Sequence, residues 1–411
     1  MLAHHSCLLG PGFWIRFTVH YNLCVGTIVA LGSIDQVKVL VDWQDQGLLG
    51  CFSLTEKFAG VNSGMIVNTT ATWDSNRQSF ILSTPAHGAK KNWISQGLVA
   101  DKTAVVADLV IDSKSYGPHG FMMNLREHGD VVDGVSHGDM GKKSVGNDLD
   151  NAWIAFNNVV LPKESLLNKY ADIVDNQYVQ HIKDLPIFHM IGQRLFTGRV
   201  AVAQAALTFQ RRLFAMTKEY TDNKMCWSPK GEVPLSSIPQ LSSIYAEEKV
   251  KSAKLEQFLS RCEMELSTHL KDGTLPSLQL VEAIAAAKVL VVEEAINLSF
   301  RLKNEVGSYA LMAGTGFDQT DFLQCCKFAE GDSRILMQKM SRDRMRLFEK
   351  KKQVKGGTNK AEFDAEDEAC AQLAHAMQNY PNKTEAWDEE WERVYQLAEL
   401  VMTRIVKSYV E

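Results

Sequence analysis

The sequence has 411 residues, more than one hydrophobic core usually supports, so it predicts two or three domains. An apolar content of 45%, a charged content of 23% and a net charge of −5 are ordinary for a globular protein and argue against nucleic acid as a partner. The longest apolar run, Ile284 to Val292, contains Lys288 and is too short to predict a membrane span. The eight cysteines lack metal-site spacing, so we expect free thiols and no bound metal.

Helices are expected at the start of the chain. Apolar and small residues dominate 17–31, and residues 35–45 form a second, short amphipathic segment. These two helices are few for an independent domain. We therefore interpret residues 1–47 as the remnant of an N-terminal helical domain.

From residue 48 the pattern changes to that of β-strands. Alternating β-branched and aromatic residues, separated by Asn, Gly and Asp turns, predict strands at 50–55, 66–73, 79–83, 92–95, 104–111, 120–125 and 152–156. No helix-length segment separates these strands. The pattern therefore predicts a β domain over 48–168, a barrel or a sandwich.

The remainder of the chain is predicted to be helical. Segments with a period near 3.6 lie at 188–219, 238–269, 276–305 and 333–352, with a loop at Pro229 and Pro234. We place a helical bundle at 169–352. Residues 353–411 are predicted to form a linker and an acidic helical annex, with helices at 361–380 and 383–409. The expected fold class is thus α+β and multidomain.

The segment Phe328–Asp332, which lies between two helical patterns, carries the first candidate functional residue. Glu330 precedes a glycine and follows Phe328 and two cysteines, so its carboxylate is poorly solvated on one side. Such a carboxylate can be a base with a raised pKa. It can equally be an acidic residue in the first turn of a helix, where the helix dipole favours it. The local sequence leaves both interpretations open.

Four further positions have a functional and a structural interpretation. Thr55, at a strand end, could hold an electron-rich ring or a phosphate, or form a local turn. Trp93 could cover a flat cofactor ring with Ser95 donating a hydrogen bond, or be a core tryptophan. Arg199 could contact an anionic ligand or form a salt bridge, and Lys224 could touch a phosphate or lie in solvent.

Several motifs in order resemble the acyl-CoA oxidases, within the acyl-CoA dehydrogenase superfamily. The resemblance runs from about Arg16 to about Met340. The matching segments are 16–23, 30–32, 50–56, 69–74, 83–85, 92–97, 116–121, 138–141, 150–151, 156–159, 166–170 and 329–332. It implies a helical domain, a β-barrel domain and a four-helix-type domain, with FAD bound between barrel and bundle at the interface of a homodimer.

The resemblance also implies a reaction and roles for single residues. A fatty acyl-CoA would be desaturated to the trans-2-enoyl-CoA, with Glu330 as the base that removes the α proton, and O2 would reoxidise the flavin to give H2O2. Thr55 and Ser95 would bond the flavin. The remaining residues that the resemblance assigns to FAD are Phe52, Leu54 and Trp93 at the ring, Asp332 and Arg334 at the phosphate or adenosine end, and Lys224 as the nearest counterpart of a pyrophosphate-binding arginine. Arg199 would face the acyl-CoA.

Two alternatives stay open beside the oxidase. One is an acyl-CoA dehydrogenase that passes electrons to an electron-transfer flavoprotein, and the other is an inactive paralogue that serves as a partner subunit. The family resemblance implies a peroxisomal location, although the chain does not end in the peroxisomal tripeptide.

Overall fold

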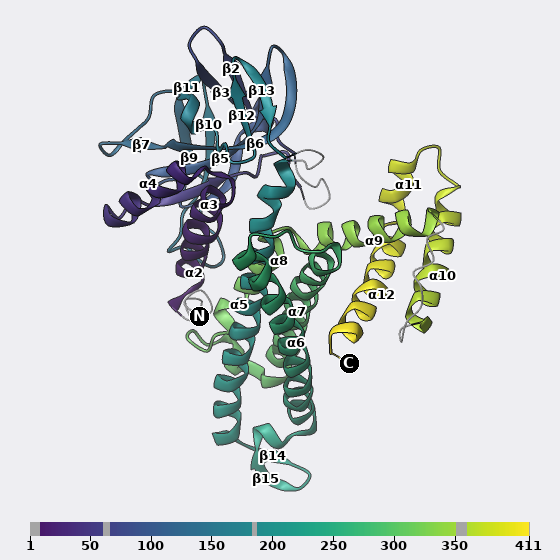
Figure 1. The fold of residues 1–411 in the computed structure, drawn as a ribbon. Helices are drawn as coiled ribbons and strands as arrows, with labels where there is room; N and C mark the ends of the chain where they lie inside the picture. The colour runs from purple at the N-terminus through teal and green to yellow at the C-terminus, as the bar shows by residue number, and fades with distance from the viewer. Residues whose placement is uncertain (1–8, 61–65, 183–186, 351–359, 411) are drawn as a thin grey trace. The chain divides into compact units, whose positions relative to one another are not determined.

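The computed structural model describes residues 9–60, 66–182, 187–350 and 360–410 (Figure 1). The predicted linker falls on residues 351–359, which lie outside the described residues. The chain divides into two units, residues 1–198 and 199–411, and the division falls inside the long helix α5 (Ile187–Asn223). Each unit has its own hydrophobic clusters.

The first unit begins with the expected helices. One helical run comprises α2 (Pro11–Thr18), a π-helical segment η2 (Val19–Val25) and α3 (Gly26–Leu31), and α4 (Ile34–Asp45) follows. Ser33 and Gln36 form a capping box that starts α4. The backbone N–H of Gly50 donates to Nδ1 of His20 at 2.9 Å. A Cβ at Gly50 would lie 2.5 Å from the Cys24 sulfur, so this close approach requires glycine.

The strands of the first unit form two main sheets and two short hairpins. The larger sheet has the order β1-β5-β2-β3-β11, with β6 also paired to β5, and the smaller has the order β4-β10-β9. The bounds are β1 (Gly50–Ser53), β2 (Thr70–Asp74), β3 (Ser79–Ser83), β4 (Lys91–Ser95), β5 (Lys102–Ile111), β6 (Lys114–Asn124), β7 (Arg126–Glu127), β8 (Asp130–Val131), β9 (Val135–Asp139), β10 (Asn151–Phe156), β11 (Val159–Pro162), β12 (Ala171–Val174) and β13 (Gln177–Gln180).

Strand β5 organises the packing of this unit. Its side chains alternate between two clusters, with Val105 and Ala107 in the core shared by the two sheets and Ala104 and Val106 in a cluster with the N-terminal helices. A strand buried on both faces reads as a nearly continuous apolar run, as 104–111 does. The apolar run therefore predicts β5 because both faces of this strand are covered.

Helices build the second unit. They are the C-terminal part of α5, α6 (Pro239–Asp272), α7 (Leu278–Val306), α8 (Asp321–Phe328), α9 (Ser333–Glu349), α10 (Lys360–Met377), α11 (Lys383–Glu389) and α12 (Trp391–Val410), with 3-10 turns in between. Helix α6 packs on α7, and α12 packs on α9, α10 and α7. Helix α7 is buried around most of its circumference, which its Ala-rich and Val-rich sequence permits.

The structure differs from the predicted elements in several places. The segment with Pro229 and Pro234 is a hairpin, β14 (Met225–Ser228) paired with β15 (Gly231–Pro234), where we expected a loop. The single helix expected at 383–409 is two helices, α11 and α12, and α8 was not predicted. The hairpin β12–β13 follows residue 168, inside the segment predicted as helical bundle. These strands are only four residues long, too short for a periodic signal.

Candidate functional site

Glu330 lies in a tight turn between α8 and α9. It has a φ of 57°, and Gly331 after it has a φ of 94°, so two consecutive residues are left-handed. A non-glycine residue in this region costs about 1–3 kcal/mol and persists only where the surroundings hold it. The first turn of α9 starts later, with Asp332 as its N-cap. The acidic residue at the helix start is therefore Asp332, and Glu330 is outside the helix.

The buried basic side chains of Lys288 and Arg199 hold the backbone of this turn. Lys288, on α7, is fully buried. Its ammonium donates to the carbonyl of Lys327 at 2.5 Å, to the carbonyl of Gly331 at 3.0 Å and to Oγ of Ser333 at 3.2 Å. Arg199, on α5, is buried as well, and its Nε donates to the carbonyl of Glu330 at 3.1 Å. Charge-assisted hydrogen bonds thus fix the backbone on both sides of the Glu330 side chain.

The carboxylate of Glu330 is desolvated. Its Oε2 atom is buried and has no hydrogen-bond partner among the described residues. Burial raises the pKa of Glu330 from 4.5 to about 8, and the positive charges of Arg199 and Lys288 offset only part of that effect. Burial also lowers the pKa of Lys288 to about 7. A carboxylate with a pKa near neutrality is chemically suited to accept a proton from a weak carbon acid.

The residues after Glu330 have structural contacts of their own. The side chain of Asp332 accepts a hydrogen bond from the Arg334 backbone N–H at 2.8 Å, which caps α9. The guanidinium of Arg334 lies 4.8 Å from the ring centroid of Tyr395 on α12. Their predicted place near the phosphate or adenosine end of a cofactor stays a prediction.

In the first unit, Thr55 and β4 are joined through a buried ion pair. Glu56 and Lys91 are both fully buried, and their charged groups lie 2.9 Å apart. Lys91 also donates to the carbonyls of Leu54 and Val106, and Glu56 accepts from the Thr69 N–H at 2.8 Å. A buried pair with these additional partners fixes the chain that leaves β1.

Thr55 and Trp93 lie on the two segments that this ion pair joins. The backbone N–H of Asn92 donates to the carbonyl of Thr55 at 2.8 Å. Thr55 is exposed, and Trp93 is 57% exposed with a φ of 58°, so it is not the core tryptophan of the structural interpretation. Ser95 accepts a hydrogen bond from the Asn151 side chain at 3.2 Å. An exposed indole near exposed and half-buried hydroxyls suits a flat ring with polar edges.

Phe52 and Leu54 point to the apolar interior of this unit. Phe52 is buried in the cluster with Cys24, Ile28 and Leu31, and Leu54 is half-buried and packs against the same cluster. Their predicted contact with a cofactor ring stays a prediction. Their observed contacts support the strand that ends at Thr55.

Lys224 lies far from Glu330 within the second unit. It follows the last residue of α5, at the base of the β14–β15 hairpin, and it is exposed. Arg199, which contacts the Glu330 turn, is 25 positions earlier on the same helix, so the two are about 37 Å apart along the axis at 1.5 Å per residue. One chain therefore does not bring Lys224 and Glu330 together.

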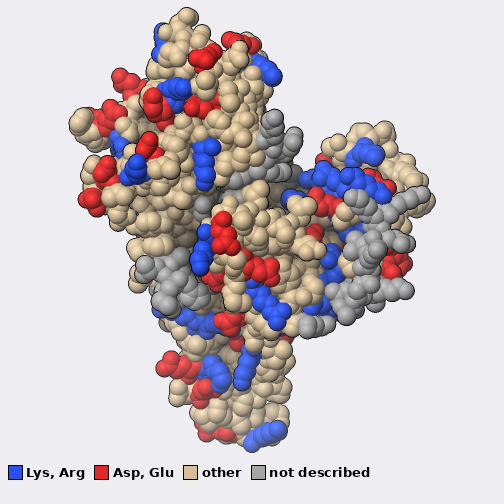
Figure 2. All heavy atoms as spheres, in the orientation of Figure 1, with Lys and Arg blue, Asp and Glu red and all other residues tan. Residues whose placement is uncertain are grey.

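Other features of the described chain do not form a competing site. Among the described residues there is no group of three or more His, Cys, Asp or Glu side chains placed to hold a metal ion. The described helices include none that is long and apolar enough to cross a membrane. On the face drawn in Figure 2, positive and negative side chains are interspersed, without a field of one sign.

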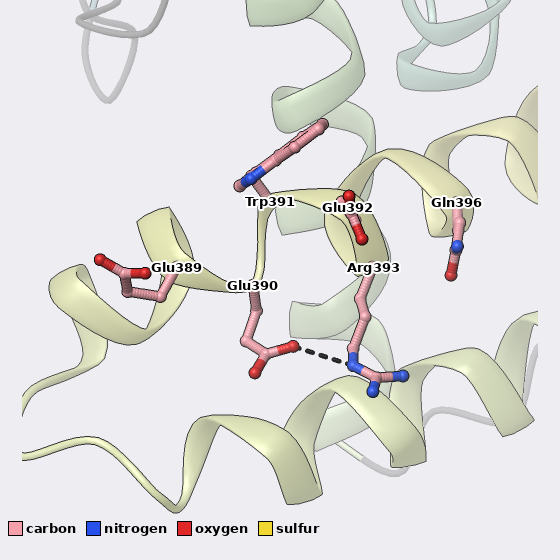
Figure 3. A pocket seen from close by; sticks show the side chains of 6 residues that line it. All are labelled: Glu389, Glu390, Trp391, Glu392, Arg393 and Gln396. Atoms are coloured by element: carbon pink, nitrogen blue, oxygen red, sulfur yellow. Dashed lines mark hydrogen bonds and ion pairs between the residues drawn. The ribbon is translucent and has the colours of Figure 1, made fainter.

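A shallow pocket of about 230 Å³ lies where α11 meets α12 (Figure 3). Its only interaction between lining residues drawn there is the ion pair of Glu390 with Arg393 at 2.8 Å. The lining residues are Glu389, Glu390, Trp391, Glu392, Arg393 and Gln396. The pocket contains none of the predicted site residues.

Lys288 is a residue of this site that the sequence motifs do not identify. The signal was present, because Lys288 is the one charge inside the longest apolar run. A lysine in such a run must find acceptors in the interior. Its acceptors are 39 to 45 positions away in the sequence, and helix periodicity does not identify contacts at that separation.

Comparisons with known proteins bear on this arrangement. No family model matches the chain. It is 28% identical over 354 residues to acyl-coenzyme A oxidase 2 of Yarrowia lipolytica. This match covers 79% of this chain and 49% of that protein. It is 32% identical over 224 residues to a protein of Arabidopsis thaliana named as a peroxisomal acyl-coenzyme A oxidase 3.2, covering 53% of this chain and 33% of that protein.

The fold is also found among solved structures. Acyl-CoA oxidase-2 of Caenorhabditis elegans, solved with FAD, ascaroside-CoA and ATP, superposes with a TM-score of 0.84 at 19% identity. The match covers 99% of this chain and 66% of that one, and it confirms the predicted fold class. The chain spans about half the length of the curated relatives it matches.

Proposed function

We propose that this chain is a member of the acyl-CoA oxidase family and an FAD-dependent enzyme that desaturates a fatty acyl-CoA between its α and β carbons and reduces O2 to H2O2. The observation that carries the proposal is the buried Glu330 carboxylate, whose Oε2 has no hydrogen-bond partner in the described parts of the chain and whose pKa burial raises to about 8. Sequence relatives named as acyl-CoA oxidases support the choice of substrate class and of O2 as acceptor.

The residues present fit a flavin in two respects. Trp93 exposes its indole on the strand that also carries Ser95, and Thr55 is exposed on the segment bonded to that strand. The hydroxyls of Thr55 and Ser95 would hydrogen-bond the polar edge of the ring system, and Trp93 would cover its face. Bound FAD would accept the hydride from the β carbon and pass two electrons to O2.

Glu330 would perform the proton transfer. The hydrogen on the α carbon of a thioester is a weak acid, so its removal needs a base that is stronger than an ordinary carboxylate. Burial of Oε2 provides this, because the ionised form is poorly solvated and gains by taking a proton. The proton passes from the α carbon to Glu330, and the C–H bond electrons form the new double bond as the β hydride leaves.

The cellular and assembly roles belong to the same proposal. The Arabidopsis relative named as peroxisomal supports a place in peroxisomal fatty acid β-oxidation. A homodimer is proposed from the family resemblance. In a dimer, Lys224 could serve the cofactor of the second copy, since in its own chain it lies far from Glu330 along α5.

The test is the purified protein itself. We expect a yellow protein with the visible flavin spectrum, which fatty acyl-CoA converts to enoyl-CoA in air with release of H2O2. A protein that needs an added electron acceptor and forms no H2O2 would be a dehydrogenase. A colourless protein that takes up no added FAD would refute both enzymes and leave the inactive partner subunit.

A further inference from the structure

Lys288 is a fully buried charged residue that the proposed mechanism does not use. It sits among Ala285, Ala286, Ala287 and Val289 on α7, all of them buried. All three of its donor positions are occupied, by two carbonyls and one hydroxyl at 2.5–3.2 Å. A fully buried ammonium with three acceptors is satisfied as a donor, so its location is specified by these bonds.

The residues that carry the three acceptors lie on both sides of Glu330 in the sequence. The Lys327 carbonyl belongs to the last turn of α8, the Gly331 carbonyl follows Glu330, and Ser333 begins α9. The Arg199 bond to the Glu330 carbonyl adds a second anchor from α5. Neither Glu330 nor Gly331 belongs to a helix, so no helical hydrogen bond stabilises their left-handed conformation. The bonds from Lys288 and Arg199 are the contacts that hold it.

We propose that Lys288 is the positioning residue for Glu330: its ammonium clamps α8, the turn and α9 together, and so holds the carboxylate at the place where the substrate proton is taken. This inference rests on the proposed function for its catalytic purpose. The hydrogen bonds that form the clamp all join residues of the second unit, so the clamp does not depend on the proposed function. Lys288 acts through the backbone and touches no substrate.

The charge of Lys288 gives the clamp a second effect. The groups that interact with its charge are Asp332 in the turn, Cys326 on α8, Arg199 on α5 and Glu293 on α7 itself. Glu293 is in turn paired with Lys327 at 2.8 Å. The positive charge of Lys288 lowers the pKa of Glu330, and burial opposes it. Because burial lowers the pKa of Lys288 itself to about 7, Lys288 keeps only part of its charge where Glu330 titrates, and removing that part should raise the pKa of Glu330 further.

The experiment compares Lys288→Met, Lys288→Arg and the wild-type holoenzyme. Hydrogen–deuterium exchange of the peptide around 325–335 reports on the clamp without substrate. The pH dependence of anaerobic flavin reduction by acyl-CoA reports on Glu330. In Lys288→Met we expect the exchange rate of this peptide to increase roughly 10- to 100-fold. We expect the rate of flavin reduction to decrease by a similar factor. This factor corresponds to the loss of one hydrogen bond to a charged group. We also expect the midpoint of its pH profile to move to higher pH.

Two comparisons separate positioning from general destabilisation. Lys288→Arg keeps the charge and should keep a midpoint near that of the wild type. Lys339→Met removes an exposed lysine of α9 that is paired with Asp343, and it should change neither exchange nor midpoint. If Lys288→Met does not fold, Lys288→Gln, which keeps donors and loses the charge, should show the raised midpoint.

The clamp is overturned if Lys288→Met, or Lys288→Gln in its place, leaves both exchange and midpoint unchanged. Slower reduction with an unshifted midpoint in every variant would overturn the electrostatic effect. A wild-type holoenzyme that acyl-CoA does not reduce would refute the proposed function and the catalytic purpose of the clamp. Exchange would still decide whether Lys288 holds the turn.

Discussion

The raised pKa of Glu330 has a consequence for stability that needs no substrate. In the unfolded chain Glu330 titrates near 4.5, and in the folded protein near 8. Between these values the folded state keeps a proton that the unfolded state has released, so folding stability falls as pH rises through this window. Replacing Glu330 by Gln removes this titrating carboxyl group, and with it the loss of folding stability at higher pH.

The size of the effect follows from the shift. Each pKa unit is worth about 1.4 kcal/mol, so by pH 7 the proton that the folded state keeps, and the unfolded state has released, costs the fold about 3 kcal/mol relative to pH below 4.5. For a unit of this size, 1 kcal/mol changes Tm by about 2–4 °C. Glu330→Gln should therefore melt roughly 6–12 °C above the wild type at pH 7, with the gap closing toward pH 5.

The assay is thermal unfolding of the two proteins at pH 5, 6, 7 and 8. Glu399→Gln is the matched control, because it removes an exposed carboxylate from α12 in the same unit. The control should not show a gain that grows with pH. If the difference in Tm between Glu330→Gln and the wild type is the same at every pH, the carboxylate is not desolvated and the reasoning fails.

Three further outcomes are expected. Lys91→Met leaves the Glu56 carboxylate buried without its counter-charge and should cost about 3–5 kcal/mol in urea unfolding, and the double variant with Glu56→Gln should recover part of this. Trp93→Gly should change stability by less than about 1 kcal/mol, because glycine accepts a φ of 58°, yet weaken FAD binding in a titration; equal FAD affinity would remove Trp93 from the site. Glu366→Gln, whose carboxylate accepts from Arg344 and Arg404 at 2.6 Å each, should cost about 3–5 kcal/mol in urea unfolding, and an unchanged midpoint would contradict a buried ion network.

Sequence patterns predicted the long elements well. Residues 104–111 and 276–305 were assigned correctly because β5 is buried on both faces and α7 contains the apolar run of residues 284–292, and such runs carry a strong signal. The hairpin β14–β15 was missed because its strands are four residues long and two prolines favour a loop. Short elements depend on contacts with the rest of the fold, which local periodicity does not contain.

The site was predictable in part. Glu330, Thr55 and Trp93 were singled out from the sequence, but the exposure of Trp93 and the left-handed turn at Glu330 result from tertiary contacts. Lys288 and Arg199 reach that turn from other helices, more than 30 positions away in the chain. The sequence shows which chemistry a side chain can perform. It does not show which distant residues hold that side chain in place.

One measurement tests the central claim most directly: anaerobic mixing of the flavin-loaded protein with a fatty acyl-CoA, with and without the Glu330→Gln substitution. The wild type should lose its visible flavin absorbance as the substrate is desaturated. Glu330→Gln should bind FAD equally well and be reduced about 10²–10⁴ times more slowly, the usual contribution of a general base. Equal reduction rates in the two proteins would contradict the assignment of Glu330 as the base.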